Sequence, residues 1–95
     1  MPSTVDIGTL IERSPEIRSG RPRIAGTGVT VMRIAGWAKL GLTPEEIVAK
    51  FGRLTLAQIH AALAYYHANR PEIDKDIADE ESAVEEFFPA TLPPA

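Results

Sequence analysis

Two helix-start signals lie only twelve residues apart, and they constrain the fold of this chain more than any other feature. Thr43 is followed three residues later by Glu46, and Thr55 is followed three residues later by Gln58. A threonine with Glu or Gln at this spacing forms the capping box of a helix N-terminus. Gly52 lies between the two boxes and is typical of a residue that ends a helix. The sequence therefore predicts two consecutive short helices with about three non-helical residues between them.

A third helix is predicted just upstream. It spans residues 31–40 and ends at Gly41, while the two capped helices span 44–51 and 56–70. Two short helices with so brief a connection cross at a steep angle, which is the shape of a helix-turn-helix. Because such a pair cannot bury its apolar faces alone, the upstream helix must supply a third wall. Residues 31–70 are therefore expected to form a trihelical core, in a mainly α-helical protein of one domain.

Residues 7–31 are predicted to contain short β-strands. Strand-like pieces at 10–12, 23–25 and 29–31 are separated by turn residues. An isolated two-stranded hairpin is marginally stable in water, so these strands must pack on the helices, on a second copy or on a partner. Strand pairing would provide a dimer or partner interface. The residues expected there are Arg21, Arg23, Ile24, Val29 and Val31.

The C-terminal part, residues 71–88, is predicted to form an acidic amphipathic helix. One face is apolar and the other carries carboxylates, and the helix ends in two adjacent phenylalanines. We interpret this face as a docking surface for a partner protein; the alternative is that it packs back on the trihelical core. Residues 89–95 are proline-rich and are expected to be disordered. The residues of the docking face are Ile73, Ile77, Val84, Phe87 and Phe88.

The net charge of −3 hides an uneven distribution. Residues 1–53 carry eight basic and five acidic side chains, whereas residues 54–95 carry two basic and eight acidic ones. A basic front half suits an anionic partner, although solvated faces alone also produce such a split.

Enzymatic and metal chemistry find little support in the sequence. There is no cysteine, and no serine lies in a nucleophile motif. His60 and His67 are about 10 Å apart along a helix, too far to share one metal ion. We therefore expect no catalytic site, no metal and no cofactor.

Nucleic-acid binding is the main chemical hypothesis. In a helix-turn-helix the second helix places its N-terminal residues against base edges, and cations around it contact phosphates. The reading helix holds few cations, so useful affinity requires two copies on adjacent half-sites. The residues expected to contact DNA are Arg33, Lys50, Arg53, Thr55, Gln58 and Ala61.

The ordered string "GRPRIAGT", "GLTPEEI", "LTLAQI" and "ALAYY" resembles the DUF433 family of small prokaryotic proteins. The resemblance covers about residues 10–75 and implies a homeodomain-like helix-turn-helix preceded by short strands. It also implies an antitoxin whose gene often lies beside that of a PIN-like ribonuclease toxin. One departure is Gly28, because members of the family usually have arginine directly after "GT".

The expected function is thus that of a type II antitoxin, which binds operator DNA as a dimer and docks its toxin through residues 71–88. The rival hypothesis is a protein-interaction module that uses the same scaffold without binding DNA. No stretch is apolar enough for a membrane span, and the N-terminus does not read as a signal peptide, so the cytoplasm is the expected compartment.

Overall fold

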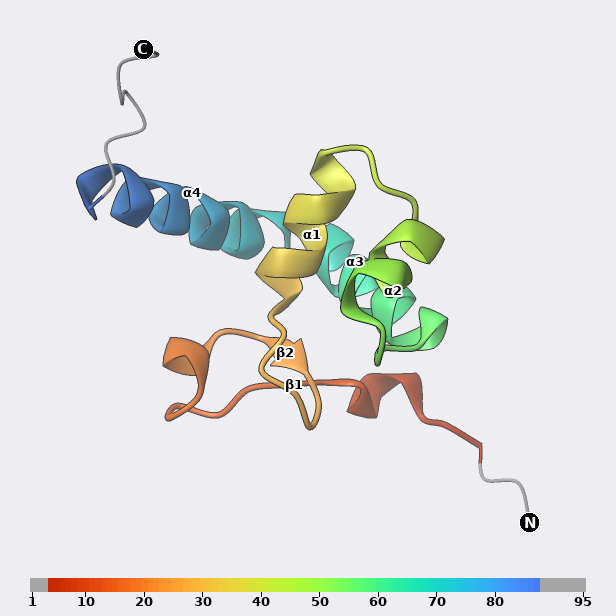
Figure 1. The fold of residues 1–95 in the computed structure, drawn as a ribbon. Coiled ribbons are helices and arrows are strands. Elements are labelled where there is room, and N and C mark those ends of the chain that lie inside the picture. The colour runs from red at the N-terminus through yellow and green to blue at the C-terminus, as the bar shows by residue number, and fades with distance from the viewer. Residues whose placement is uncertain (1–3, 88–95) are drawn as a thin grey trace.

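A small β-hairpin precedes four α-helices in the part of the chain that this computed structural model describes, residues 4–87, with side chains described for residues 4–82 (Figure 1). The protein is therefore mainly helical with a short N-terminal antiparallel hairpin, as predicted. The elements are η1 (Ile7–Thr9), β1 (Ile11–Glu12), η2 (Arg18–Gly20), β2 (Arg23–Ile24), α1 (Val31–Lys39), α2 (Pro44–Phe51), α3 (Leu56–Ala68) and α4 (Arg70–Phe87).

Both predicted capping boxes are present. The amide of Glu46 donates to the Thr43 hydroxyl at 3.2 Å, and the Glu46 carboxylate accepts from the Thr43 amide at 2.8 Å. The same reciprocal pair joins Thr55 and Gln58 at 3.1 and 2.7 Å. Gly52 ends α2 with a φ of 70°, which favours glycine. These local signals place the α2–α3 connection where the sequence predicts it.

α1 begins at Val31, which is the last residue of the strand piece predicted at 29–31. Thr30 is the N-cap, and its hydroxyl accepts from the Arg33 amide at 3.2 Å. Val31 is therefore the first residue of the helix rather than the end of a strand. Its side chain is fully buried, so it belongs to the core and is not available to a partner.

One hydrophobic core lies between the hairpin and the helices. α1 and α3 form its centre, with α2 on one side and the first turns of α4 on the other. Every element except η1 and η2 contributes to it or packs against it. The buried members are Ile24, Val31, Ile34, Ala35, Ile47, Leu54, Ile59, Ala62, Tyr66 and Ile73.

The prediction that Ile73 docks a partner is wrong. Ile73 has no exposed surface and packs in the core, and Ile77 is partly buried against it. For these first turns of α4, the alternative that the helix packs back on the core is correct. Val84 and Phe87 lie within α4, but their side chains, like Phe88 and residues 89–95, are outside the described part of the structure.

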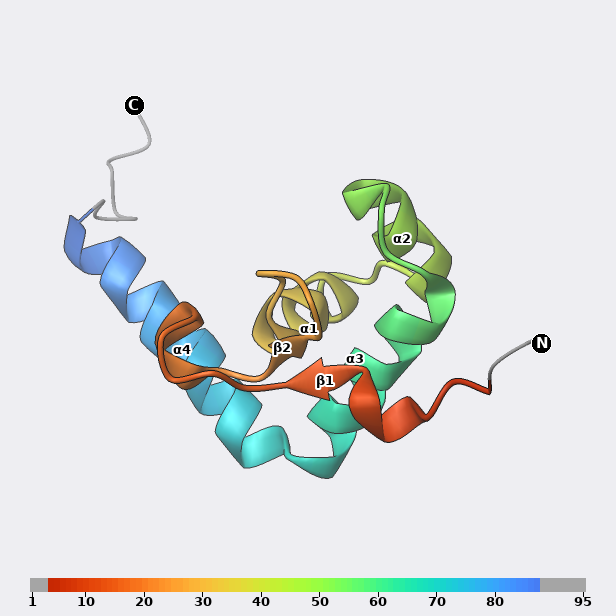
Figure 2. The same cartoon turned by 90° about the horizontal axis from the view of Figure 1, so that it is seen from below.

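The hairpin packs against α1 and α3 rather than presenting a free strand (Figure 2). β1 pairs with one edge of β2, through Ile11 opposite Ile24. The other edge is taken by the chain itself, because the Ile24 amide donates to the Val29 carbonyl at 2.8 Å and Arg23 forms a bridge with Thr30. The predicted strand dimer is therefore wrong for β2, whose two edges are both occupied, and Ile24 is fully buried.

None of the helices in the described residues has the length and apolarity that a membrane crossing requires.

Candidate nucleic-acid interface

Half of the cations in residues 1–53 are neutralised by carboxylates of the same chain. Three of these four pair with α4, which lies across the N-terminal region, and the fourth pairs with β1. The acidic helix thereby cancels much of the positive charge of the front half. The pairs are Arg13 with Glu72, Arg21 with Asp76 and Glu80, Lys39 with Asp74, and Arg23 with Glu12.

Arg23 is a structural residue and does not lie on a partner surface. Its side chain is 5% exposed and pairs with Glu12 at 2.8 Å. It also donates to the Thr27 carbonyl at 2.9 Å and to the Ser14 hydroxyl at 3.0 Å. Glu12 in turn accepts from the Gly26 amide at 3.1 Å. Arg23 and Glu12 therefore hold the loop between β2 and α1 in place, which corrects the interface role predicted for Arg23.

The other four cations of residues 1–53 have no carboxylate within 4 Å among the described side chains, and all four are exposed. We call them the basic band: Arg18, Arg33, Lys50 and Arg53. The Lys50 ammonium lies 5.2 Å from the Trp37 ring centre, and the Arg33 guanidinium lies 5.6 Å from that of Phe51. These cation–π contacts hold the charges at the surface without neutralising them.

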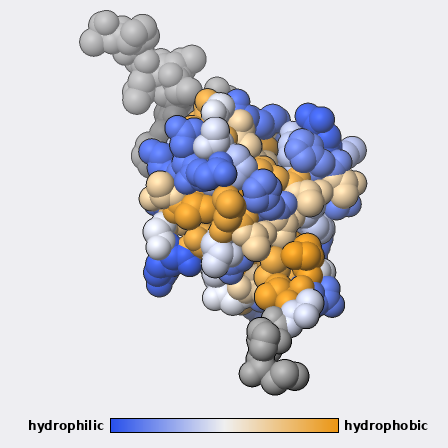
Figure 3. All heavy atoms as spheres, turned by 90° about the vertical axis from the view of Figure 1, so that its right-hand side faces the viewer, coloured by the Kyte–Doolittle hydropathy of each residue, from blue (hydrophilic) through white to orange (hydrophobic). Residues whose placement is uncertain are grey.

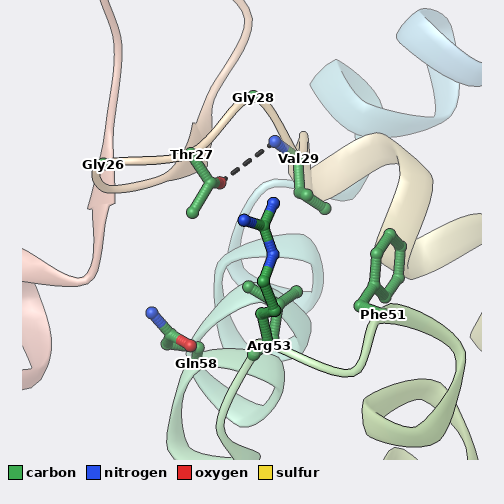
Figure 4. A pocket seen from close by; sticks show the side chains of 8 residues that line it. Gly26, Thr27, Gly28, Val29, Phe51, Arg53 and Gln58 are labelled. Atoms are coloured by element: carbon green, nitrogen blue, oxygen red, sulfur yellow. Dashed lines mark hydrogen bonds between the residues drawn. The ribbon is translucent and has the colours of Figure 1, made fainter.

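Three members of the band lie around two adjoining surface hollows that share Gly28. Arg53 lines a hollow of about 470 Å³ together with Gly28, and Arg18 and Arg33 line a second hollow that also includes Gly28. Arg53 points from the α2–α3 turn towards the loop that carries Thr27 and Gly28 (Figure 4). We call this first hollow the loop–turn hollow. Its lining residues are Gly26, Thr27, Gly28, Val29, Phe51, Arg53, Leu54 and Gln58.

The loop side of this hollow is ordered by its own hydrogen bonds. The Thr27 hydroxyl accepts from the Val29 amide at 3.0 Å (Figure 4) and donates to the Ile24 carbonyl at 2.8 Å. Val29 is partly buried in the loop rather than part of a strand. An anion that enters the hollow would thus meet a fixed loop on one side and the Arg53 guanidinium on the other.

Arg18 is a member of the band that is not among the residues predicted to contact DNA. Its Nε donates to the Gly28 carbonyl at 3.0 Å, and a Cβ at Gly28 would lie 3.0 Å from Arg18 Nη2. The backbone of Arg18 and Ser19 has positive φ, 51° and 57°, which side-chain-bearing residues rarely adopt. This turn places an arginine from η2 beside Gly28.

The predicted base-reading residues of α3 are only partly available. Ala61 is 7% exposed and faces the core, so its predicted DNA contact is wrong. The Thr55 hydroxyl and the Gln58 side-chain oxygen are both engaged in the capping box. Gln58 therefore keeps one amide donor group towards the hollow, whereas bidentate recognition of adenine needs its oxygen as well.

Two aspartates of α4 that pair with cations of the N-terminal region, Asp74 and Asp76, have opposite pKa shifts. Burial raises the pKa of Asp76, against the opposing charge of Arg21, and its Oδ2 is buried without a hydrogen-bond partner in the described structure. Hydrogen bonds from Lys39 and from the Tyr66 hydroxyl lower the pKa of Asp74. The α4 contact is thus sensitive to pH at two neighbouring points.

We expect an NMR titration of the side-chain carboxyls to show Asp76 above and Asp74 below the ordinary value of 3.8. A raised pKa in the folded state means that Asp76 contributes stability below pH 3.8 that is lost as the pH rises through its folded pKa. Asp74 does the reverse, losing its contribution as the pH falls. Arg21→Gln should raise the pKa of Asp76 further and leave that of Asp74 in place. A pKa of Asp76 that falls in this variant would contradict the described contact.

Comparison with known proteins supports the fold. A family model described as "Protein of unknown function (DUF433)" matches residues 11–66. The crystal structure of a DUF433 member protein from Anabaena variabilis ATCC 29413 is 30% identical, with a TM-score of 0.70, and the match covers 74% of this chain and 69% of that one. No curated protein matches. On the family match, which includes the hairpin, α1, α2 and most of α3, this chain is a member of the DUF433 family.

Proposed function

We propose that this protein is a type II antitoxin that binds operator DNA as a dimer and neutralises a PIN-like ribonuclease toxin. α2 and α3 form the helix-turn-helix, and the basic band contacts phosphates. The observation that carries the proposal is the division of the cations of residues 1–53. Half are neutralised by carboxylates of the same chain, and the other half, the basic band, have no carboxylate within 4 Å among the described side chains.

The positions of the band suit phosphate contacts. Arg33 lies on α1, Lys50 in the last turn of α2 and Arg53 in the turn that leads into α3. When the first turn of a second helix enters the major groove, the elements around it face the flanking phosphates. Arg53 lines the loop–turn hollow together with Gln58, so a phosphate held there would lie next to the first turn of α3.

Phosphate contacts carry most of the affinity in this proposal. The exposed side of α3 near its start consists of Leu56, Ala57 and His60, and Gln58 offers a single donor group. Such a surface discriminates weakly between bases. Binding is therefore expected to depend steeply on salt.

The toxin contact is proposed for the part of residues 71–88 that follows Ile77. Ile73 is in the core, which leaves the later turns of α4 for a partner. Their described surface carries the exposed acidic residues Asp79 and Glu80, which suit a basic partner surface. The assignment of this partner as a toxin rests on the resemblance to the DUF433 family.

A substitution of Gln58 tests the placement of α3 without disturbing its cap. Gln58→Glu keeps the capping box, since glutamate serves equally at N3, but replaces the free donor by negative charge. We expect the affinity for duplex DNA to fall about tenfold with no loss of thermal stability. Glu46→Gln is the matched control, because it alters the equivalent position of α2 and should not weaken binding. Unchanged DNA affinity of Gln58→Glu would remove α3 from the interface.

The protein-interaction module remains a second candidate because of the apolar surface. Figure 3 shows hydrophobic patches between hydrophilic ones on the side of the molecule that it presents. Val5, Ile7 and Leu56 are 60, 58 and 40% exposed. A partner bound through such residues would stay bound at high salt, in contrast to DNA.

A further inference from the structure

A groove of about 510 Å³ lies between α1 and α4, away from the α2–α3 turn. Its floor is largely apolar, and Leu40 at its edge is 73% exposed. We call it the α1–α4 groove. Its lining residues are Arg33, Gly36, Trp37, Lys39, Leu40, Ile77 and Glu81.

Gly36 in this groove has no explanation among the described residues. It lies inside α1, where glycine destabilises a helix relative to alanine. A Cβ built at Gly36 would meet no atom of the described residues within 4 Å, so no described neighbour requires the absence of a side chain. A backbone or side chain of another molecule that approaches α1 closely at this point would require it.

The two rims of the groove carry opposite charges. Arg33 lies on the α1 side, and Glu81 lies on the α4 side. Arg33 and Glu81 both line the groove, yet they form no ion pair within 4 Å in the described chain. Such a surface is complementary to itself, because a two-fold rotation brings the basic rim of one copy opposite the acidic rim of the other.

We propose that a second copy of this chain packs on the α1–α4 groove about a two-fold axis, with the two α1 helices crossing at Gly36. Arg33 of each copy then faces Glu81 of the other, and Leu40 and Ile77 become buried. This places the dimer on the helices and not on the strands. Arg33 becomes an interface residue in this dimer, so Arg18, Lys50 and Arg53 are the band members that each copy offers to phosphates. The role of the dimer rests on the proposed function, since two copies double these phosphate contacts, but its geometry does not.

The test measures the oligomeric state of the full chain without DNA, by sedimentation equilibrium between about 1 and 100 µM. The wild type is expected to dimerise. Gly36→Leu fills the groove and should weaken dimerisation at least about tenfold, while its melting temperature is unchanged or higher because α1 loses a glycine. Ala49→Leu is the control: it adds a leucine at an exposed site of α2 and should leave the dimer intact.

Charge reversal adds a readout that a structural effect cannot imitate. Arg33→Glu and Glu81→Arg should each weaken the dimer about tenfold, and the double variant should restore it. A monomeric wild type at 100 µM, or a Gly36→Leu variant that dimerises as before, would overturn the inference. If the wild type binds DNA as a monomer, this interface is wrong and the phosphate contacts are still supported. If it forms a dimer that depends on the groove but binds no DNA, the interface is supported and the proposed function is contradicted.

Discussion

Replacing Arg23 with alanine is expected to lower the free energy of unfolding by about 3 kcal/mol. The side chain is 5% exposed and serves three partners, the Glu12 carboxylate, the Thr27 carbonyl and the Ser14 hydroxyl. Its removal leaves a cavity beside β2 and frees the loop between β2 and α1. Glu12 is 44% exposed and can be rehydrated, which keeps the loss below that of a fully buried ion pair.

Chemical denaturation of Arg23→Ala and Arg21→Ala measures this difference directly. Arg21 stands two residues away in the sequence, but its side chain is 25% exposed and its carboxylate contacts are longer, 3.7 and 3.3 Å. Its loss should therefore cost below about 1 kcal/mol. Equal stabilities of the two variants would show that Arg23 is not the buried link between β1, β2 and the loop.

The double variant Lys50→Ala/Arg53→Ala is expected to bind DNA about 100-fold more weakly than the wild type. Each of the two side chains contributes a charge-assisted contact to a phosphate, and each contact is lost twice in a dimer. Both side chains are exposed, so the fold should be retained. Among the described residues, the intramolecular contact at stake is the cation–π contact of Lys50 with Trp37, about 1 kcal/mol or less.

A charge-matched control separates specific contacts from net charge. Arg70→Ala/Lys75→Ala also removes two positive charges, but from α4, where Arg70 lies over the Tyr66 ring and Lys75 pairs with Asp79. Its DNA affinity should fall only slightly, through long-range electrostatics. If both double variants lost the same affinity, the basic band would have no special role, and only the total charge of the protein would matter.

The helical part of the fold could be predicted because its signals are local. Each capping box links residues three apart, and Gly52 ends α2 through its own backbone conformation. Such features are formed by neighbours in the sequence and need no knowledge of tertiary contacts. The strand pieces predicted at 10–12 and 23–25 also lie close to β1 and β2, because alternating apolar residues and turn residues mark them in the sequence.

The roles of individual charged residues could not be predicted in the same way. Arg21 and Arg23 lie in one short basic stretch, but one reaches α4 and the other is buried against β1, contacts that depend on residues 10 to 60 positions away. The hydrophobic spacing that includes Ile73 is the same whether this face of the helix is free or buried, and in the structure Ile73 is buried in the core. Arg18 reaches Gly28 only through a turn with positive φ, which its sequence does not signal.

The most direct test of the central claim is a salt series with the wild-type protein. Its affinity for duplex DNA from upstream of its own gene, and for an unrelated duplex, is measured between 50 and 200 mM salt. With Arg18, Lys50 and Arg53 on phosphates, the logarithm of the binding constant should fall with the logarithm of salt concentration with a slope of about −2.7 per protomer, and the upstream duplex should bind more tightly. Absence of binding at 50 mM, or binding with no salt dependence, would contradict the account and favour the protein-interaction module.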